Sequence, residues 1–190
     1  MALYGSRSPA AFAIGMAVTV LQGFPPLAGD APTVLVLGSM PSVASLEKHQ
    51  YYGKPQNAFW RIMGELFGAG PELDYATRCE QLTAARIAVW DVIASCRREG
   101  SLDSAIDMQS VEVNDFAGFL SRYPTVSTVC FNGRKAEETW RRFVAAQVSE
   151  VRPALAYLSL PSTSPAMAML DFAGKLERWQ VIKEIAETDA

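Results

Sequence analysis

Residues 33–42 read Thr-Val-Leu-Val-Leu-Gly-Ser-Met-Pro-Ser, an apolar run that stops at a short turn-like segment. The run from Thr33 to Leu37 is rich in β-branched side chains, which is typical of a strand buried on both faces. Gly38 and Pro41 are residues that turns favour. The pattern predicts a central strand with a tight loop at its carboxyl end.

The same pattern of short apolar strands separated by amphipathic helices recurs along the chain. Further strands are expected at 86–92, 126–131 and 155–160, and helices at 57–67, 136–148 and 168–186. In the second helix, Trp140, Phe143 and Val144 are expected on one buried side. Strands that alternate with helices form a parallel sheet covered on both faces. We therefore predict an α/β fold, a three-layer αβα sandwich around a four-stranded parallel sheet.

Composition limits the classes of site. The 190 residues are 49% hydrophobic, enough for a core, and the formal net charge is −3, so we expect few contacts to phosphates if DNA is bound. His49 is the single histidine, and the three cysteines form no CxxC pair. We therefore expect no metal and no cofactor. The free thiols suit the reducing cytoplasm.

The first residues differ from the rest of the chain. Ala10 to Leu21 is mildly apolar but too short to cross a bilayer, so no membrane partner is expected. We interpret 1–20 as an N-terminal extension that need not be ordered, and 21–190 as a single domain. Low net charge and the absence of heptad repeats favour a monomer.

In parallel sheets, ligands bind beyond the carboxyl ends of the strands. Each predicted strand is followed there by small or polar residues: Ser39, Met40 and Ser42; Asp91; Asn132; and Ser162, Thr163, Ser164 and Pro165. One such end carries little information, but four that meet at one edge indicate a site.

The segment Tyr51-Tyr52 followed by Asn57 adds aromatic and amide groups to this edge. A tyrosine on a loop offers a flat face on which a base can stack. The alternative is that one of the two tyrosines packs beneath the loop. Asn57 is a natural N-cap for the following helix, and a cap there also lies at the edge of the site.

The remaining strand ends each have a structural and a functional interpretation. Asp91 either caps a following helix or binds a ligand, because a buried carboxylate is costly without a partner. Arg97 and Arg98 are expected in a loop, either solvated or holding a phosphate. Ser162 to Pro165 are expected to begin the last helix, where hydroxyls and N–H groups cap the helix or bind an anion.

Several common catalytic motifs are absent. The sequence contains no GxGxxG, no GxxxxGK[ST] and no GxSxG, and a serine triad would depend on His49. The residues by themselves indicate a pocket for a planar ring with phosphate contacts around it, and hence nucleotide or nucleic-acid binding.

The segments quoted above resemble the uracil-DNA glycosylase superfamily, and within it the hypoxanthine-DNA glycosylase branch. The resemblance extends from Gly23 to the C-terminal helix. Its motifs are Gly23–Pro26, Leu37–Ser42 with Ser45-Leu46, Gln50–Pro55, Asn57, Phe59-Trp60, Trp90–Val92, Gly100–Asp103, Phe131–Gly133 with Lys135-Ala136, and Leu160–Ala166.

The resemblance implies an enzyme that swings a deaminated base out of DNA and hydrolyses its bond to deoxyribose, with hypoxanthine as the expected base. Many members hold the attacking water with Asp or Asn soon after the first strand's glycine. Ser39 takes that place here, and the resemblance points to Asn57 instead. Asn57 and Ser39 are therefore the expected catalytic residues, with Asn57 orienting the water because an amide cannot act as a base.

The resemblance also implies which residues surround the base and the DNA. The expected base-binding residues are Tyr52, Asp91, Met40 and Asn132; those expected at phosphates or between bases are Ser42, Ser162, Ser164, Pro165 and Met167. Many members have histidine where Ser162 stands, and close members have asparagine where Met167 stands. Met167 is either a wedge between bases or a core residue.

Three other functions remain open at this point. The same fold can act on uracil or on mismatched bases, or the chain can be a non-catalytic module that binds DNA or nucleotides. A small-molecule hydrolase that uses the serines at the strand ends is the third, although no triad supports it.

Overall fold

The computed structural model describes residues 20–188. Its central sheet consists of β2 (Val34–Gly38), β3 (Ile87–Asp91), β6 (Thr128–Asn132) and β7 (Ala156–Leu160), all parallel, in the order β3-β2-β6-β7. This confirms the predicted four-stranded parallel sheet. β2 is fully buried along its length because it lies between two strands and beneath helices on both faces.

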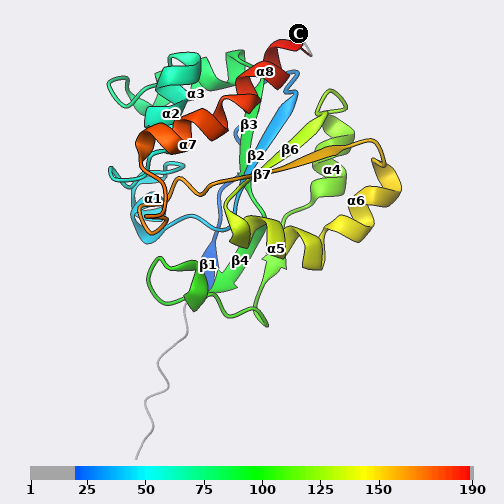
Figure 1. Cartoon of the computed structure of the whole chain (residues 1–190). Helices are drawn as coiled ribbons and strands as arrows, with labels where there is room; N and C mark the ends of the chain where they lie inside the picture. Colours follow the sequence, from blue (N-terminus) through cyan, green and yellow to red (C-terminus); the bar gives the residue numbers. More distant parts are fainter. Residues whose placement is uncertain (1–19, 189–190) are drawn as a thin grey trace, which may run out of the picture.

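Eight helices surround this sheet in the described part of the chain: α1 (Val43–Lys48), α2 (Phe59–Phe67), α3 (Tyr75–Ala84), α4 (Phe116–Arg122), α5 (Arg134–Phe143), α6 (Ala145–Val151), α7 (Phe172–Trp179) and α8 (Val181–Thr188). Helices α2, α3, α7 and α8 cover one face, and α4, α5 and α6 cover the other (Figure 1). The fold is therefore the expected α/β sandwich.

A second, antiparallel sheet was not predicted. It consists of β1 (Val20–Gln22), β4 (Ile93–Arg97) and β5 (Glu112–Val113), in the order β1-β4-β5. Only Val92 separates β3 from β4, and no Gly or Pro marks the boundary. Asp91 is therefore followed by a strand, and the interpretation of Asp91 as a helix cap is wrong.

Two predicted helices have different bounds. The helix expected at 136–148 is divided at Val144 into α5 and α6, and Phe143 is 36% exposed although it was expected to be buried. The helix expected at 168–186 is also divided, at Gln180, into α7 and α8. It begins at Phe172, because the Asp171 side chain accepts a hydrogen bond from Gly174 N and so caps it there. Ser162 to Pro165 therefore lie in a loop.

The main hydrophobic core lies on both sides of β2 and β6, with Phe59, Trp140 and Trp179 among its largest buried side chains. Within residues 20–188, no helix is both long and apolar enough to cross a membrane. The predicted N-terminal extension lies, apart from Val20, outside the described residues.

Candidate active site

The site is built around Gly38, the last residue of β2. Gly38 pairs with Asp91, the last residue of β3, so the two lie side by side at the carboxyl edge of the sheet. A β-carbon at Gly38 would lie 2.3 Å from Asp91 Oδ1 and 3.3 Å from the Tyr52 hydroxyl. Only glycine leaves room for both groups here, so Asp91 and Tyr52 meet at the end of the central strand.

Asp91 is a buried carboxylate, with only 4% of its surface exposed, and its Oδ2 has no hydrogen-bond partner. Burial is the largest cause that raises the pKa of Asp91, the charge of Asp103 adds to it and Arg98 opposes it, and the net pKa is about 7. A buried oxygen without a partner is costly, and perturbed pKa values concentrate at functional sites. Asp91 thus has the properties expected of a group that meets a ligand.

Tyr52 reaches the same point from the loop after α1. Its backbone has φ of 52°, a left-handed conformation that is rare for a large residue. Its hydroxyl is buried and makes no hydrogen bond of standard geometry. Burial, followed by the charge of Asp91, raises its pKa well above the ordinary value, and the nearby Asn132 side chain opposes this shift. One face of its ring stacks on Phe59, with centroids 3.9 Å apart. A base can therefore stack only on the opposite face.

Tyr51 has the structural role that was considered for one of the two tyrosines. It is 5% exposed, and its hydroxyl donates to Pro25 O at 3.0 Å. Its backbone N–H donates to the Tyr75 hydroxyl at 2.9 Å. Tyr51 therefore fixes the loop from which Tyr52 extends.

Asn57 is held at the start of α2. The N-cap of α2 is Ala58 rather than the expected Asn57, and Ala58 makes no side-chain cap hydrogen bond. The Asn57 Oδ1 accepts a hydrogen bond from Phe59 N at 3.0 Å, a turn that leads into the helix. The neighbouring Ala58 N donates to Thr163 O at 2.9 Å, which ties this turn to the loop after β7. A carbonyl oxygen has two lone pairs, so Oδ1 still has capacity to accept from a water.

Ser39 has a partner that the sequence did not reveal. Its Oγ donates to Asp103 Oδ1 at 2.6 Å, across 64 positions of the chain. Asp103 begins a short 3₁₀ helix, η1 (Asp103–Ala105), in the connection between β4 and β5. Gly100–Asp103 was among the motifs of the resemblance, but no pattern within it indicated that its carboxylate would meet the end of β2.

Arg98 is buried, contrary to the expectation of a loop arginine that is solvated or holds a phosphate. It is 7% exposed and donates to Gly100 O at 2.9 Å and to Pro41 O at 2.5 Å, while its Nη1 has no partner. Burial lowers its pKa, and the neighbouring acidic groups oppose that shift. Arg98 therefore joins the loop after β2 to the connection that carries Asp103.

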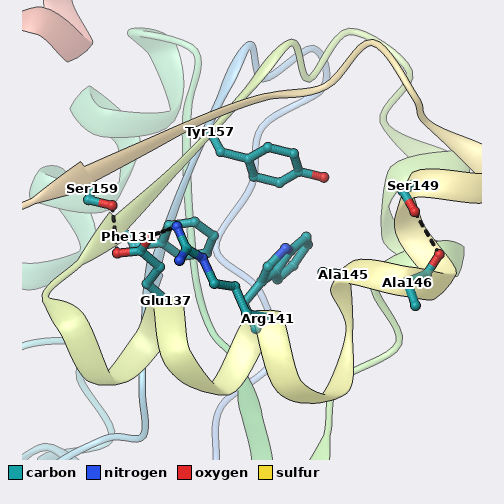
Figure 2. A pocket seen from close by; sticks show the side chains of 9 residues that line it. Phe131, Glu137, Arg141, Ala145, Ala146, Ser149, Tyr157 and Ser159 are labelled. Atoms are coloured by element: carbon teal, nitrogen blue, oxygen red, sulfur yellow. Dashed lines mark hydrogen bonds and ion pairs between the residues drawn. The ribbon is translucent and has the colours of Figure 1, made fainter.

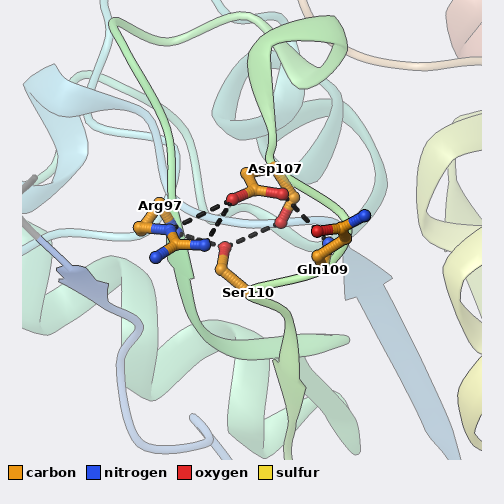
Figure 3. A network of polar contacts seen from close by, with 4 residues as sticks. All are labelled: Arg97, Asp107, Gln109 and Ser110. Atoms are coloured by element: carbon orange, nitrogen blue, oxygen red, sulfur yellow. Dashed lines mark hydrogen bonds and ion pairs between the residues drawn. The ribbon is translucent and has the colours of Figure 1, made fainter.

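The base of this connection is closed by a polar network (Figure 3). Arg97, the last residue of β4, pairs with Asp107 at 2.8 Å, and its backbone N–H donates to Ser110 Oγ at 2.8 Å. Asp107 also accepts from Gln109 N at 3.0 Å. Arg97 was likewise expected in a loop, and it belongs to a strand and to this network instead. We call residues 98–110 the Asp103 loop.

The loop after β7 is fastened at three points. Asn132 Oδ1 accepts from Thr163 N at 2.8 Å, and its Nδ2 donates to Thr163 Oγ1 at 2.9 Å. The Lys175 ammonium donates to Ser164 O at 3.1 Å, and the Trp179 indole donates to Pro161 O at 2.9 Å. Asn132 therefore orients this loop, and its contact with a base stays a prediction.

The serines expected at phosphates are held by local hydrogen bonds. Ser42 Oγ caps α1 by accepting from Ser45 N, and Ser162 and Ser164 each accept from the backbone N–H two residues ahead. Because no helix begins at Ser162, a helix N-terminus does not contribute to an anion site there. Pro165 is exposed. The phosphate contacts of these residues stay predictions.

Met40 and Met167, which were expected to contact the base and the DNA, are not fully exposed. Met40 is 6% exposed and packs with Ile93, Cys96 and Ile106 in a small separate cluster. Met167 is half-buried, whereas Met169 on the same loop is 88% exposed. No sequence pattern distinguished Met169, although it is more exposed than Met167.

A cavity of about 510 Å³ lies elsewhere, between β7 and helices α5 and α6. Phe131, Trp140 and Tyr157 line it, and Glu137 pairs with Arg141 and accepts from Ser159 at its edge (Figure 2). It shares no residue with the predicted site. The part of the chain from 20 to 188 contains no group of three acidic, histidine or cysteine side chains arranged to hold a metal ion.

Residues 25–185 match the family model described as the uracil DNA glycosylase superfamily. The chain belongs to this superfamily. Membership assigns it to the DNA glycosylases, a class of hydrolases, and confirms the resemblance found in its motifs.

Curated and solved relatives agree with this assignment. The chain is 42% identical over 120 residues to a Methanosarcina acetivorans protein named hypoxanthine DNA glycosylase, and 40% identical over 118 residues to one of the same name from Methanosarcina barkeri. These alignments cover 63% and 62% of this chain and 75% and 73% of the relatives. A solution NMR structure from Methanosarcina acetivorans, described as a candidate uracil DNA glycosylase, matches with a TM-score of 0.73 at 32% identity, over 89% of this chain and 99% of that one.

Proposed function

We propose that this superfamily member removes hypoxanthine from DNA. The observation that carries the proposal is the pair of buried polar atoms without partners beside Gly38, the Tyr52 hydroxyl and Asp91 Oδ2. Among residues 20–188 five buried side-chain atoms lack a partner, and those of Tyr52, Asp91 and Arg98 belong to this site. A ligand that supplies the complementary groups would recover the cost of leaving them unpaired.

The two groups match one edge of hypoxanthine. Its N1–H can donate to the ionised Asp91 carboxylate, and the adjacent O6 can accept from the Tyr52 hydroxyl. In this arrangement the hydroxyl, rather than the ring face, of Tyr52 meets the base, which is consistent with Phe59 occupying one side of that ring. Adenine presents the opposite order of donor and acceptor at these positions and is rejected.

The same edge disfavours uracil and xanthine. In both bases the N–H is flanked by two carbonyl oxygens, so one of them faces the second carboxylate oxygen. In hypoxanthine the second neighbour is a C–H group, and no such repulsion arises. Guanine shares the N1–H and O6 groups, but its complete pairing with cytosine makes it more costly to extrude than a mispaired base.

Cleavage then requires a water opposite the departing base. The carbon–nitrogen bond breaks with its electron pair on the base, and the sugar develops the positive charge of an oxocarbenium ion. The water oxygen bonds to the sugar carbon and releases one proton to solvent, and the departing base takes one proton from solvent. We assign the orientation of this water to Asn57, whose Oδ1 is fixed by Phe59 N. The protein acts as a single chain on DNA.

The test is a base-release assay. Duplexes that carry one deoxyinosine, deoxyuridine or deoxyxanthosine are incubated with the protein, and abasic sites are then cleaved with alkali. Scission at deoxyinosine well above the other two supports the proposal. Scission at deoxyuridine alone supports the uracil alternative, and DNA binding without scission supports the non-catalytic one. Asn57→Ala, purified identically, controls for contaminating glycosylases.

A further inference from the structure

Asp103 is a charged residue at the site that has no role in the reaction proposed above. Its side chain is exposed, and its Oδ1 accepts from the Ser39 hydroxyl directly beyond Gly38. Its negative charge acts on both Asp91 and Tyr52, the two groups that flank Gly38. Asp103 therefore lies beside the base-binding pair, although it comes from the connection between two strands of the other sheet.

The position of Asp103 is built into the fold and is not a chance contact of a surface loop. The network of Arg97, Asp107 and Ser110 closes the base of the Asp103 loop (Figure 3). The buried Arg98 joins its start to Pro41, and Ser101 Oγ accepts from Val43 N at 3.0 Å. Together with the Ser39–Asp103 hydrogen bond, these make three contacts that hold the Asp103 loop against the segment that follows β2.

Ser39 and Asp103 together offer what Asn57 lacks. An amide orients a water but carries no charge, and a serine hydroxyl alone carries none either. The transition state of glycosidic cleavage is cationic, and fixed negative charge close to it is a strong source of stabilisation. Asp91 is assigned to the base edge, where it is buried at the end of β3, and so it is not available to face the sugar.

We propose that Asp103, held by the Ser39 hydroxyl, supplies the negative charge that stabilises the cationic sugar during base release. This inference rests on the proposed glycosylase reaction but not on which base is removed. The two aspartates then have separate tasks, since Asp91 reads the base and Asp103 faces the sugar.

The deciding variant is Asp103→Asn, which keeps a hydrogen-bond acceptor for Ser39 and removes the charge. We expect kcat to fall about a hundredfold. DNA affinity should be unchanged or tighter, because a negative charge close to the phosphates is lost. A purely structural role would instead weaken binding or lower the melting temperature. Glu99→Gln removes an exposed charge from the same loop and should change kcat less than threefold. Asp103→Glu should retain more activity than Asp103→Asn.

A second readout does not depend on turnover. Asp103, Arg98, Tyr51 and Tyr52 are the charged or titratable groups that act on or border Asp91. Removing the Asp103 charge should therefore lower the pKa of Asp91, as followed by carboxyl-carbon NMR. If the wild-type protein is active and the kcat of Asp103→Asn lies within threefold of it, this inference alone is overturned. A wild-type protein inactive on deoxyinosine, deoxyuridine and deoxyxanthosine overturns both proposals.

Discussion

Gly38 and Asp91 end neighbouring parallel strands so closely that a β-carbon on Gly38 would lie 2.3 Å from the carboxylate. We therefore expect Gly38→Ala to displace Asp91 and to lower base release at least tenfold, with about 1–3 kcal/mol lost in stability from overpacking. Denaturant titration and the base-release assay measure the two effects. In an Asp91→Ala background the same alanine should cost little stability. An equal cost in both backgrounds would show that the strain lies elsewhere.

Tyr52→Phe should stabilise the protein while it impairs the enzyme. The hydroxyl is buried without a partner, so its removal should raise the free energy of unfolding by about 1 kcal/mol. Base release from deoxyinosine should fall at least about tenfold, because the donor to O6 is lost. Tyr51→Phe is the matched control, since it removes a hydrogen bond to Pro25 O and should lower stability. A stabilised variant with full activity would exclude the hydroxyl from base recognition.

Asp91 links stability to pH. Its pKa is about 7 in the folded protein, against 3.8 as the ordinary value. Between these pH values the folded state holds a proton that the unfolded state has released, so stability falls as pH rises from about 4 to 7, by at most about 4 kcal/mol. Asp74 and Asp107, whose pKa values are lowered by hydrogen bonds, act only below this window. Chemical denaturation of Asp91→Asn across this range should show a flatter profile.

The same carboxylate should set the pH dependence of catalysis. If ionised Asp91 accepts the N1–H of hypoxanthine, kcat/KM for deoxyinosine rises with pH and levels off above about 7. Asp91→Asn should abolish this limb and change the relative rates on deoxyinosine and deoxyuridine. Identical relative rates in wild type and variant would remove Asp91 from base reading.

Asn57 has a structural and a proposed catalytic role that can be separated. Asn57→Ala removes the hydrogen bond from Phe59 N as well as the amide, at a cost of about 1 kcal/mol. Asn57→Ser keeps an acceptor for Phe59 N and should restore most of that stability. We expect both variants to lose at least about tenfold in turnover with DNA affinity retained. Recovery of turnover together with stability in Asn57→Ser would assign Asn57 to the helix alone.

Met169 provides a prediction about the DNA duplex. It is 88% exposed on the loop fixed by Lys175 and Trp179, as an apolar wedge would be. Met169→Ala should lower activity on duplex substrate more than on single strands, which need no wedge. Met167→Ala, half-buried on the same loop, is the comparison. Equal losses on both substrates would argue against a wedge at Met169.

The sequence predicted the parallel sheet well because its signals are local. The run from Thr33 to Leu37 and the strand that ends at Asp91 each carry enough apolar residues to mark a buried strand. The edge at which Asp91 and Tyr52 meet followed from the rule that parallel strands bring their carboxyl ends together.

The contacts that the sequence could not reveal are long-range and depend on packing. Ser39 and Asp103 are 64 positions apart, and β4 had no turn residue to separate it from β3. Arg98 was expected to be solvated because most arginines are, and only the fold shows that Pro41 and Gly100 surround it. The sequence offered both Ser162 and Asp171 as residues that could cap the last helix, and the structure shows that Asp171 caps it.

Surface connections between strands usually accept inserted residues at little cost. The Asp103 loop should not, because an added residue between Arg98 and Asp103 would withdraw the carboxylate from Ser39 while the sheets stayed intact. A shortened or lengthened version would fold and bind DNA yet turn over slowly. Glycosylases of this fold should therefore differ in catalytic rate according to the length of the Asp103 loop. The composition of the central sheet should matter less.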